Sequence, residues 1–203
     1  IEAMDRLIER QPDDAEHYRF RAELYRLQGA LDRAKRDYER AIKHASDSPG
    51  GYLGLAEVHI QQGQFDRAQG YAEQALARDS SGWMAAYNLG LIADRQGNAA
   101  EAILMLERAL GARIPDARHR LIAYLWLARA YLRRGQIPAA RKQLEALKKH
   151  EGAVDEWRLI FASEQAAPLR DVLADDVDLA ARLIDGSAPL EALTAPANEE
   201  RAR

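Results

Sequence analysis

The sequence predicts an all-α protein built from repeated helical hairpins, and three observations support this fold class. The 203-residue chain contains 39 Ala but only 16 Val, Ile and Thr together, and alanine favours helices whereas β-branched residues favour strands. Small residues recur at a period of 34 residues over most of the chain, which is typical of a repeat protein. Apolar residues within each period are spaced three and four apart, as in an amphipathic helix.

The first element is residues 1–14, which are predicted to form the second helix of a preceding partial repeat. Ile1, Met4, Leu7 and Ile8 would make its apolar face. Because the chain opens with Ile rather than Met, we expect it to be a processed form or a piece of a longer protein. An open end of a helical stack exposes apolar surface, so this helix could also mediate weak self-association of an otherwise monomeric chain.

Four complete units follow, and each is predicted to be a pair of antiparallel helices. Each unit has a glycine after its first helical segment, where a residue beyond the last turn often needs a positive φ. Small residues such as Ala68 and Ala102 recur on one helix face and would let the helix axes approach closely. The units are 15–48, 49–82, 83–116 and 121–154, with their glycines at Gly29, Gly63, Gly97 and Gly135.

The pattern of small and aromatic residues identifies these units more closely. The second unit contains Tyr52, Leu55, Ala56, Gly63, Phe65, Ala68 and Ala75. The fourth contains Tyr124, Leu127, Ala128, Tyr131, Gly135, Ile137 and Ala140. This pattern resembles the tetratricopeptide repeat (TPR) family over about two-thirds of the chain. The resemblance implies an α-solenoid, a right-handed superhelix of antiparallel helix pairs. His59 stands where the family has Tyr, and we interpret it as a packing residue.

The last two elements are a capping helix and a tail. Residues 155–165 are predicted to form a helix that covers the open end of the stack, as a terminal repeat requires. Residues 166–203 carry 4 Arg and 8 Asp or Glu, so this tail is acidic. An apolar pattern over 169–184 indicates a helix, whereas the segment from Gly186 onward is expected to be weakly ordered.

The sequence offers no chemistry that would indicate an enzyme. Cys is absent and the five His are scattered, so we expect no metal site, no cofactor and no catalytic residues. His119, between Arg118 and Arg120, is interpreted as part of a solvated loop. A net charge of −3 gives no reason to expect nucleic-acid binding. The longest stretch without ionisable side chains is too short to insert directly into a membrane.

The candidate binding surface is a second stripe on the first helix of each unit, away from the packing stripe. In the family this stripe lines a concave groove that holds an extended or helical peptide of a partner protein. Its apolar residues, rimmed by Arg, suggest an interaction surface. The predicted partner-binding residues are Arg26, Leu53, Glu57, Ile60, Met84, Tyr87, Asn88, Leu91, Arg95, Leu125, Arg129, Leu132 and Arg133. An alternative interpretation is that neighbouring units or the tail bury part of the stripe.

The tail is complementary in charge to the end of this groove. Arg95, Arg129 and Arg133 make that end basic, whereas Asp176 and Asp178 lie beside apolar residues of the tail. One hypothesis is therefore that residues 169–184 fold back over part of the last units, mainly through apolar contacts, because surface ion pairs alone contribute only ~0–1 kcal/mol. The alternative is that this segment is an acidic, solvated helix without a fixed position.

Two functional hypotheses remain open from the sequence. The first is an interaction scaffold or adaptor that binds a peptide or helix of another protein. The second is the regulatory or substrate-presenting portion of a larger enzyme or membrane-anchored protein. A groove that grips the C-terminal carboxylate of chaperone peptides is disfavoured, because Glu23 or Glu57 would repel the ligand. No targeting segment fixes the compartment; the cytoplasm is slightly favoured, and a periplasmic or membrane-tethered location stays open.

Overall fold

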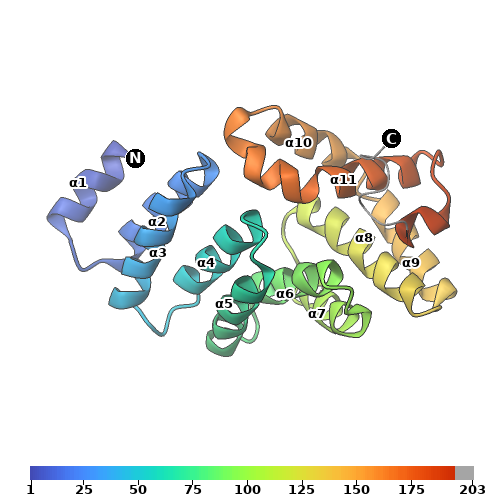
Figure 1. The fold of residues 1–203 in the computed structure, drawn as a ribbon, viewed down its shortest axis with the longest axis horizontal. Coiled ribbons are helices and arrows are strands. Elements are labelled where there is room, and N and C mark those ends of the chain that lie inside the picture. The colour runs from blue at the N-terminus through green and yellow to red at the C-terminus, as the bar shows by residue number, and fades with distance from the viewer. Residues whose placement is uncertain (195–203) are drawn as a thin grey trace.

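The computed structural model describes residues 1–194, which form eleven α-helices and two short 3-10 helices and contain no strand (Figure 1). The first nine α-helices are α1 (Glu2–Arg10), α2 (Ala15–Leu27), α3 (Leu31–His44), α4 (Gly50–Gln61), α5 (Phe65–Arg78), α6 (Trp83–Arg95), α7 (Ala99–Gly111), α8 (Ala117–Arg133) and α9 (Ile137–Lys148). The C-terminal elements are α10 (Gly152–Phe161), the 3-10 helix η1 (Glu164–Ala166), α11 (Ala167–Ile184) and the 3-10 helix η2 (Leu190–Thr194).

The middle of the chain is a stack of four helical hairpins. Helices α2 and α3, α4 and α5, α6 and α7, and α8 and α9 pack as pairs, and each pair contacts the next pair along the chain. Gly29, Gly63, Gly97 and Gly135 join the helices of the four pairs with φ between 69° and 74°. This left-handed conformation strains a side chain-bearing residue, so glycine is what permits the tight turn.

Small residues make close helix packing possible within the stack. Ala34, Ala68, Ala102 and Ala140 have no solvent-exposed surface. At Gly54, a Cβ atom would lie only 2.1 Å from the ring of Tyr38, so α4 can approach α3 only because this position lacks a side chain.

We predict that Ala68→Leu destabilises the fold by about 1–3 kcal/mol, because the added atoms have no room in this seam. Ala77→Leu is the matched control, since Ala77 lies on the exposed side of the same helix. Urea denaturation of both variants measures the difference. Wild-type stability in Ala68→Leu would contradict the assignment of Ala68 to the seam.

The start of α8 differs from the sequence-based expectation. Residues 117–120 belong to the helix, whose first turn is capped by the Asp116 side chain accepting a hydrogen bond from the Arg118 N–H at 2.7 Å. The interpretation of His119 as part of a solvated loop is therefore wrong. Its ring lies 5.2 Å from the Tyr87 ring and 5.3 Å from the Trp83 ring, between centroids. Burial among these aromatic rings lowers the pKa of His119.

The C-terminal helices fold back onto the stack. Helix α10 packs on α8 and on α11, and α11 contacts α4, α8 and α9. The predicted fold-back of the 169–184 segment is thus present, although the helix begins at Ala167 and the helix before it spans 152–161 rather than 155–165.

The end of the described chain is also more structured than expected. Instead of weak order from Gly186 onward, η2 packs against α8 and its Leu193 is 1% exposed. Ala188, Leu190 and Ala192 pack against the same core. This run of apolar residues is too short to produce a helical periodicity, so the tertiary contact could not be anticipated from the sequence. The expectation for Pro196 and 198–203 lies outside the described residues.

Candidate functional site

The first helices of the four hairpins, α2, α4, α6 and α8, line one side of the stack, and we call this surface the groove. Helix α11 lies on this side, in contact with α4 and α8 (Figure 1). Its N-terminal end reaches the first hairpin, where Gly29 approaches the backbone of Gln165 and the ring of Pro168. A segment of the chain itself therefore occupies much of the surface that the sequence marked as a binding site.

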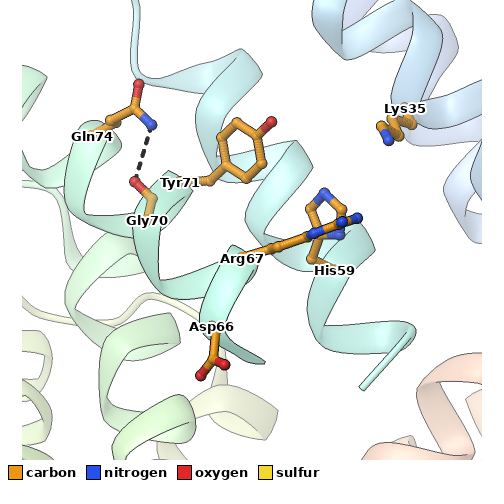
Figure 2. A pocket seen from close by; sticks show the side chains of 7 residues that line it. All are labelled: Lys35, His59, Asp66, Arg67, Gly70, Tyr71 and Gln74. Carbon is orange, nitrogen blue, oxygen red and sulfur yellow. Dashed lines mark hydrogen bonds between the residues drawn. The ribbon is translucent and has the colours of Figure 1, made fainter. Parts of the chain in front are cut away.

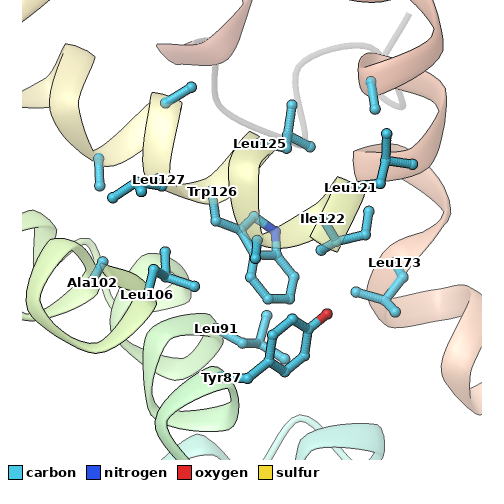
Figure 3. Packing of buried hydrophobic residues seen from close by; sticks show 14 of the residues in the cluster. Tyr87, Leu91, Ala102, Leu106, Leu121, Ile122, Leu125, Trp126, Leu127 and Leu173 are labelled. Atoms are coloured by element: carbon cyan, nitrogen blue, oxygen red, sulfur yellow. The ribbon is translucent and has the colours of Figure 1, made fainter. Parts of the chain in front are cut away.

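The apolar contacts of α11 are continuous with the main core. Leu173, Val177 and Leu183 of α11 are buried in the same cluster as Leu91 of α6 and Leu125 of α8. Figure 3 shows Leu173 facing Ile122 of α8 and Tyr87 of α6. Burial of large aliphatic side chains contributes about 1.5–3 kcal/mol each relative to exposure, so apolar burial dominates the attachment of α11.

A buried carboxylate lies in the middle of this apolar contact. Asp176 of α11 is 3% exposed. Its Oδ1 accepts a hydrogen bond from Nη2 of Arg129 at 2.6 Å, and its Oδ2 accepts bonds from Nε1 of Trp126 at 2.6 Å and Nη2 of Arg95 at 2.5 Å. We call the three donors, Arg95, Trp126 and Arg129, the carboxylate cage. Burial acts to raise the pKa of Asp176, but the Arg129 and Arg95 guanidinium groups outweigh it and hold the pKa below its ordinary value.

Asp94 supports the cage from the solenoid side. This carboxylate of α6 is 2% exposed, and its Oδ2 accepts a bond from Nη1 of Arg129 at 2.6 Å. Its Oδ1 accepts a second bond from Nη1 of Arg133 at 3.1 Å. Arg129 therefore bridges two buried carboxylates, one from the stack and one from α11. Such charge-assisted bonds hold both partners in a fixed geometry.

The N-terminal half of the groove contains a second polar cluster. Nη2 of Arg26 lies 2.6 Å from Oε1 of Glu23 and 3.1 Å from Oε2 of Glu57, and the Tyr38 hydroxyl donates to Glu23 at 2.7 Å. Burial and the neighbouring Glu23 raise the pKa of Glu57, although Arg26 opposes them. Arg26 is thus shared between two carboxylates, Glu23 and Glu57, and this cluster carries more acidic than basic groups.

The predicted binding stripe is less exposed to solvent in the structure than the sequence led us to expect. The buried members are Ile60, Tyr87, Asn88, Leu91, Leu125 and Arg129; the part-buried members are Arg26, Leu53, Glu57, Arg95 and Leu132; the exposed members are Met84 and Arg133. The expected open apolar stripe is therefore mostly covered. The reason is that its apolar members on α6 and α8 share a core cluster with α11. Their role in binding a partner stays a prediction.

The predicted partner-binding residues do not include Trp126, Asp94 or Asp176, although Asp176 belongs to the tail segment that was expected to fold over the basic end of the groove. Trp126 is fully buried, and it occupies the same position in the fourth unit as the predicted site residue Asn88 does in the third, so the repeat pattern alone could have found it. A usable signal did exist for Asp176, because it lies between Leu173 and Val177 on the apolar face of a predicted helix. A carboxylate in such a place needs a buried cationic or hydrogen-bonding partner.

A pocket outside the groove has a volume of about 380 Å³ and is lined by Lys35, His59, Asp66, Arg67, Gly70, Tyr71 and Gln74 (Figure 2). His59 is 2% exposed, stacks on Tyr71 with ring centroids 5.4 Å apart and has Nδ1 2.8 Å from Oε1 of Gln64. This confirms His59 as a packing residue. The pocket walls carry charges of both signs, and they provide no convergent set of catalytic groups.

Residues 1–194 contain neither a candidate metal centre nor a candidate membrane span. Within that part of the chain, no group of three or more His, Asp or Glu side chains is placed to hold a metal ion. Over the same residues, no helix combines the length and the apolarity that crossing a bilayer requires.

Most of the groove is covered, but another apolar surface is open. Phe20, Leu24 and Leu27 of α2 are 49%, 38% and 53% exposed. Their spacing of four and three residues places them on one face of the helix. Helix α2, which carries this face, belongs to the first hairpin of the stack and contacts α1.

Comparison with protein families gives matches over most of the chain. A family model described as Tetratricopeptide repeat matches residues 1–52 and 53–118, and a second model with the same description matches residues 95–159. The comparison with curated proteins gives no match.

Solved structures with the same fold include several repeat proteins. The structure titled "Crystal structure of YrrB: a TPR protein with an unusual peptide-binding site" has a TM-score of 0.63 and 22% identity, and the match covers 91% of this chain and 97% of that one. MamA gives a TM-score of 0.60 at 20% identity, covering 77% of this chain and 88% of its own. PilF of Pseudomonas aeruginosa gives 0.61 at 18% identity, covering 88% and 78%. At these identities the likeness concerns the fold.

Proposed function

This chain belongs to the tetratricopeptide repeat family, and from that premise we propose that it is a protein-interaction scaffold that binds a helix or peptide of a partner protein in the groove. Members of the family are typically non-catalytic scaffolds, and similarity to a peptide-binding repeat protein is consistent with such a role. We propose accordingly that this chain has no catalytic activity of its own.

The observation that carries this proposal is the occupation of the groove by α11. A helix with one apolar face lies across α4 and α8 and buries its apolar residues against them. The same surface would therefore suit a helix supplied by another protein. Helix-in-groove recognition uses apolar anchors at spacings of three, four and seven residues, which α11 provides with Leu173, Val177 and Ala180.

Binding at the covered half of the groove would require α11 to leave. A partner then competes with α11 for the groove. Because only a short segment links α11 to α10, the effective concentration of α11 at the groove is high, and the partner must bind tightly enough to overcome it. Met84 remains accessible, since its side chain is 38% exposed. A partner would first contact Met84 and then displace α11.

We predict that a photo-crosslinking amino acid at Met84 captures a partner in cells that express the protein. The same amino acid at Leu104 is the matched control, because Leu104 is exposed on α7 and outside the groove. Capture is expected at position 84 and not at 104, measured by mass spectrometry of the crosslinked product. Equal capture at both positions, or none at 84, contradicts a role for the groove.

The open face of α2 favours a second role, self-association through the N-terminal end of the stack. Exposed contiguous apolar residues commonly mark interaction surfaces. We predict that the combined Phe20→Ser and Leu27→Ser variant removes any concentration-dependent increase in mass seen by light scattering. Leu104→Ser is the control for loss of an exposed apolar residue. A wild-type chain that stays monomeric at high concentration excludes this role.

A further inference from the structure

We propose that the groove selects a helix that carries an acidic side chain in the middle of its apolar face, and that the carboxylate cage is the recognition site for this acid. The inference deepens the proposed function and rests on it. It assigns the partner a chemistry: an amphipathic helix with Asp or Glu at the place of Asp176 and apolar residues three positions before it, one position after it and four positions after it.

The solenoid itself assembles the cage. Arg95 comes from α6, and Trp126 and Arg129 come from α8. Asp94 holds Arg129 through a 2.6 Å bond that does not involve α11. Arg95 lies within 3.5 Å of the same carboxylate, and Trp126 is fixed by its burial in the core. A helix that replaces α11 would therefore meet these three donors in the same arrangement.

The balance of charges around Asp94 favours an acidic occupant of the groove. Three guanidinium groups, those of Arg95, Arg129 and Arg133, lie within 3.5 Å of Asp94 carboxylate oxygens. Without Asp176, these three cations would face one buried carboxylate. A helix with an acid at this point supplies the missing negative charge, whereas a purely apolar helix would leave Nη2 of the buried Arg129 without its acceptor. Arg95 is part-buried and also donates to the backbone carbonyl of Val172 at 2.8 Å. The cage therefore discriminates against helices that lack the acid.

Helix α11 leaves a buried polar group of the groove without a hydrogen-bond partner among residues 1–194. The Tyr87 hydroxyl is buried, and within residues 1–194 it has no hydrogen-bond partner. Figure 3 shows this hydroxyl on the side of the ring that faces Leu173 of α11. Leu173 cannot accept its hydrogen bond. A partner helix with a polar side chain near this place would pair the hydroxyl and so gain an interaction that α11 lacks.

These features also distinguish the ligand from other peptides. The acid is a side chain in the interior of an 18-residue helix, not a chain end, and apolar residues flank it on both sides. An extended peptide could not place residues at spacings of three and four on one face. The proposed ligand is therefore a helical segment with an internal Asp or Glu.

The test detaches α11 from the groove and measures which helical peptides then bind there. In the full chain, Asp176→Lys places a cation against Arg95 and Arg129, and α11 is expected to detach. Asp178→Lys is the matched control, because Asp178 lies on the exposed face of the same helix.

Detachment is measured as a distance between two spin labels. The chain has no Cys, so labels on cysteines introduced by Asp178→Cys in α11 and Leu104→Cys in α7 attach without interference. For the control variant, the label in α11 is moved to position 171, which is also exposed. Relative to a chain that carries the same pair of labels without the Lys substitution, the distance is expected to lengthen and its distribution to broaden in Asp176→Lys, and both are expected to stay unchanged in Asp178→Lys.

The binding measurement uses two probes. The first is a synthetic peptide of residues 167–185, stapled as a helix, with either Asp or Asn at position 176. The Asp176→Lys chain is expected to bind the Asp peptide at least tenfold more tightly than the Asn peptide, and at least tenfold more tightly than the Asp178→Lys chain does. Equal affinity for the two peptides overturns the inference. If circular dichroism shows that the Asp176→Lys chain is unfolded, Asp176→Asn in the full chain replaces it in the same comparison.

The second probe is a phage-displayed library of helical peptides with all positions of the apolar face randomised. Enrichment of sequences with Asp or Glu at the central position supports the inference. Enrichment of groove-binding helices without an acid there overturns the inference and leaves the proposed function standing. Failure of every chain to enrich any peptide contradicts both.

Discussion

Replacing Arg129 with Ala is expected to destabilise the protein by about 3–5 kcal/mol, because it leaves two buried carboxylates without their shared cation. Arg129 is 7% exposed and bonds to both Asp94 and Asp176. Truncation removes the guanidinium but not the cost of keeping both carboxylates out of water. Urea denaturation gives the loss in the free energy of unfolding, and Arg134→Ala is the control because Arg134 is exposed in the same region.

The pH dependence of this loss tests its electrostatic origin. In the wild type the folded-state pKa of Asp176 is lowered, so its charge stabilises the fold above a pH of about 4, and this contribution is lost as the pH falls through that lower pKa. In Arg129→Ala, burial should raise the pKa of Asp176 above its unfolded value. The variant then regains stability in acid, where the group is protonated, and is weakest at neutral pH. A deficit that is independent of pH would instead indicate lost packing.

Much of the fold could be predicted because its determinants are local. The glycines at the turns and the alanines in the helix seams recur at one period, and each hairpin contacts its sequence neighbours. A pattern of this kind needs no knowledge of distant contacts. The fold-back of the tail could also be anticipated, since its acidic and apolar composition complements the basic end of the groove.

How much of the groove the tail covers could not be predicted, because it depends on contacts between residues far apart in sequence. Arg95 and Asp176 are 81 residues apart, and Arg129 and Asp176 are 47 apart. The sequence places Leu91 and Leu125 on a stripe away from the packing face. Residues on such a stripe can either be exposed to solvent or be covered by another helix. Only the position of α11 distinguishes these states, and hydrophobic periodicity carries no information on it.

Trp126→Ala is expected to cost about 3–5 kcal/mol, the second large effect, because it removes the largest fully buried side chain of the core. The indole lies 5.1 Å from the Tyr87 ring, between centroids, and donates Nε1–H to Asp176 at 2.6 Å. The substitution therefore leaves a cavity beneath α11 and also removes one of the three donors to the buried carboxylate.

Trp126→Phe separates these two contributions, since it keeps most of the ring and removes the donor. A hydrogen bond to a charged group contributes about 1.5–3 kcal/mol, whereas one between neutral groups contributes about 0.5–1.5 kcal/mol. Trp157→Phe is the matched control for the second case, because Nε1 of Trp157 donates to the neutral backbone carbonyl of Arg118 at 3.2 Å. We expect the loss in Trp126→Phe to be the larger of the two.

A double-mutant cycle assigns the difference to Asp176. When Asp176→Asn removes the charge, the additional cost of Trp126→Phe should fall towards that of Trp157→Phe, because residues that share one network do not contribute independently. Denaturation midpoints of the four proteins in the cycle measure this coupling. If the two substitutions are instead additive, Trp126 stabilises the fold through packing alone, and the carboxylate is held by the two arginines without it.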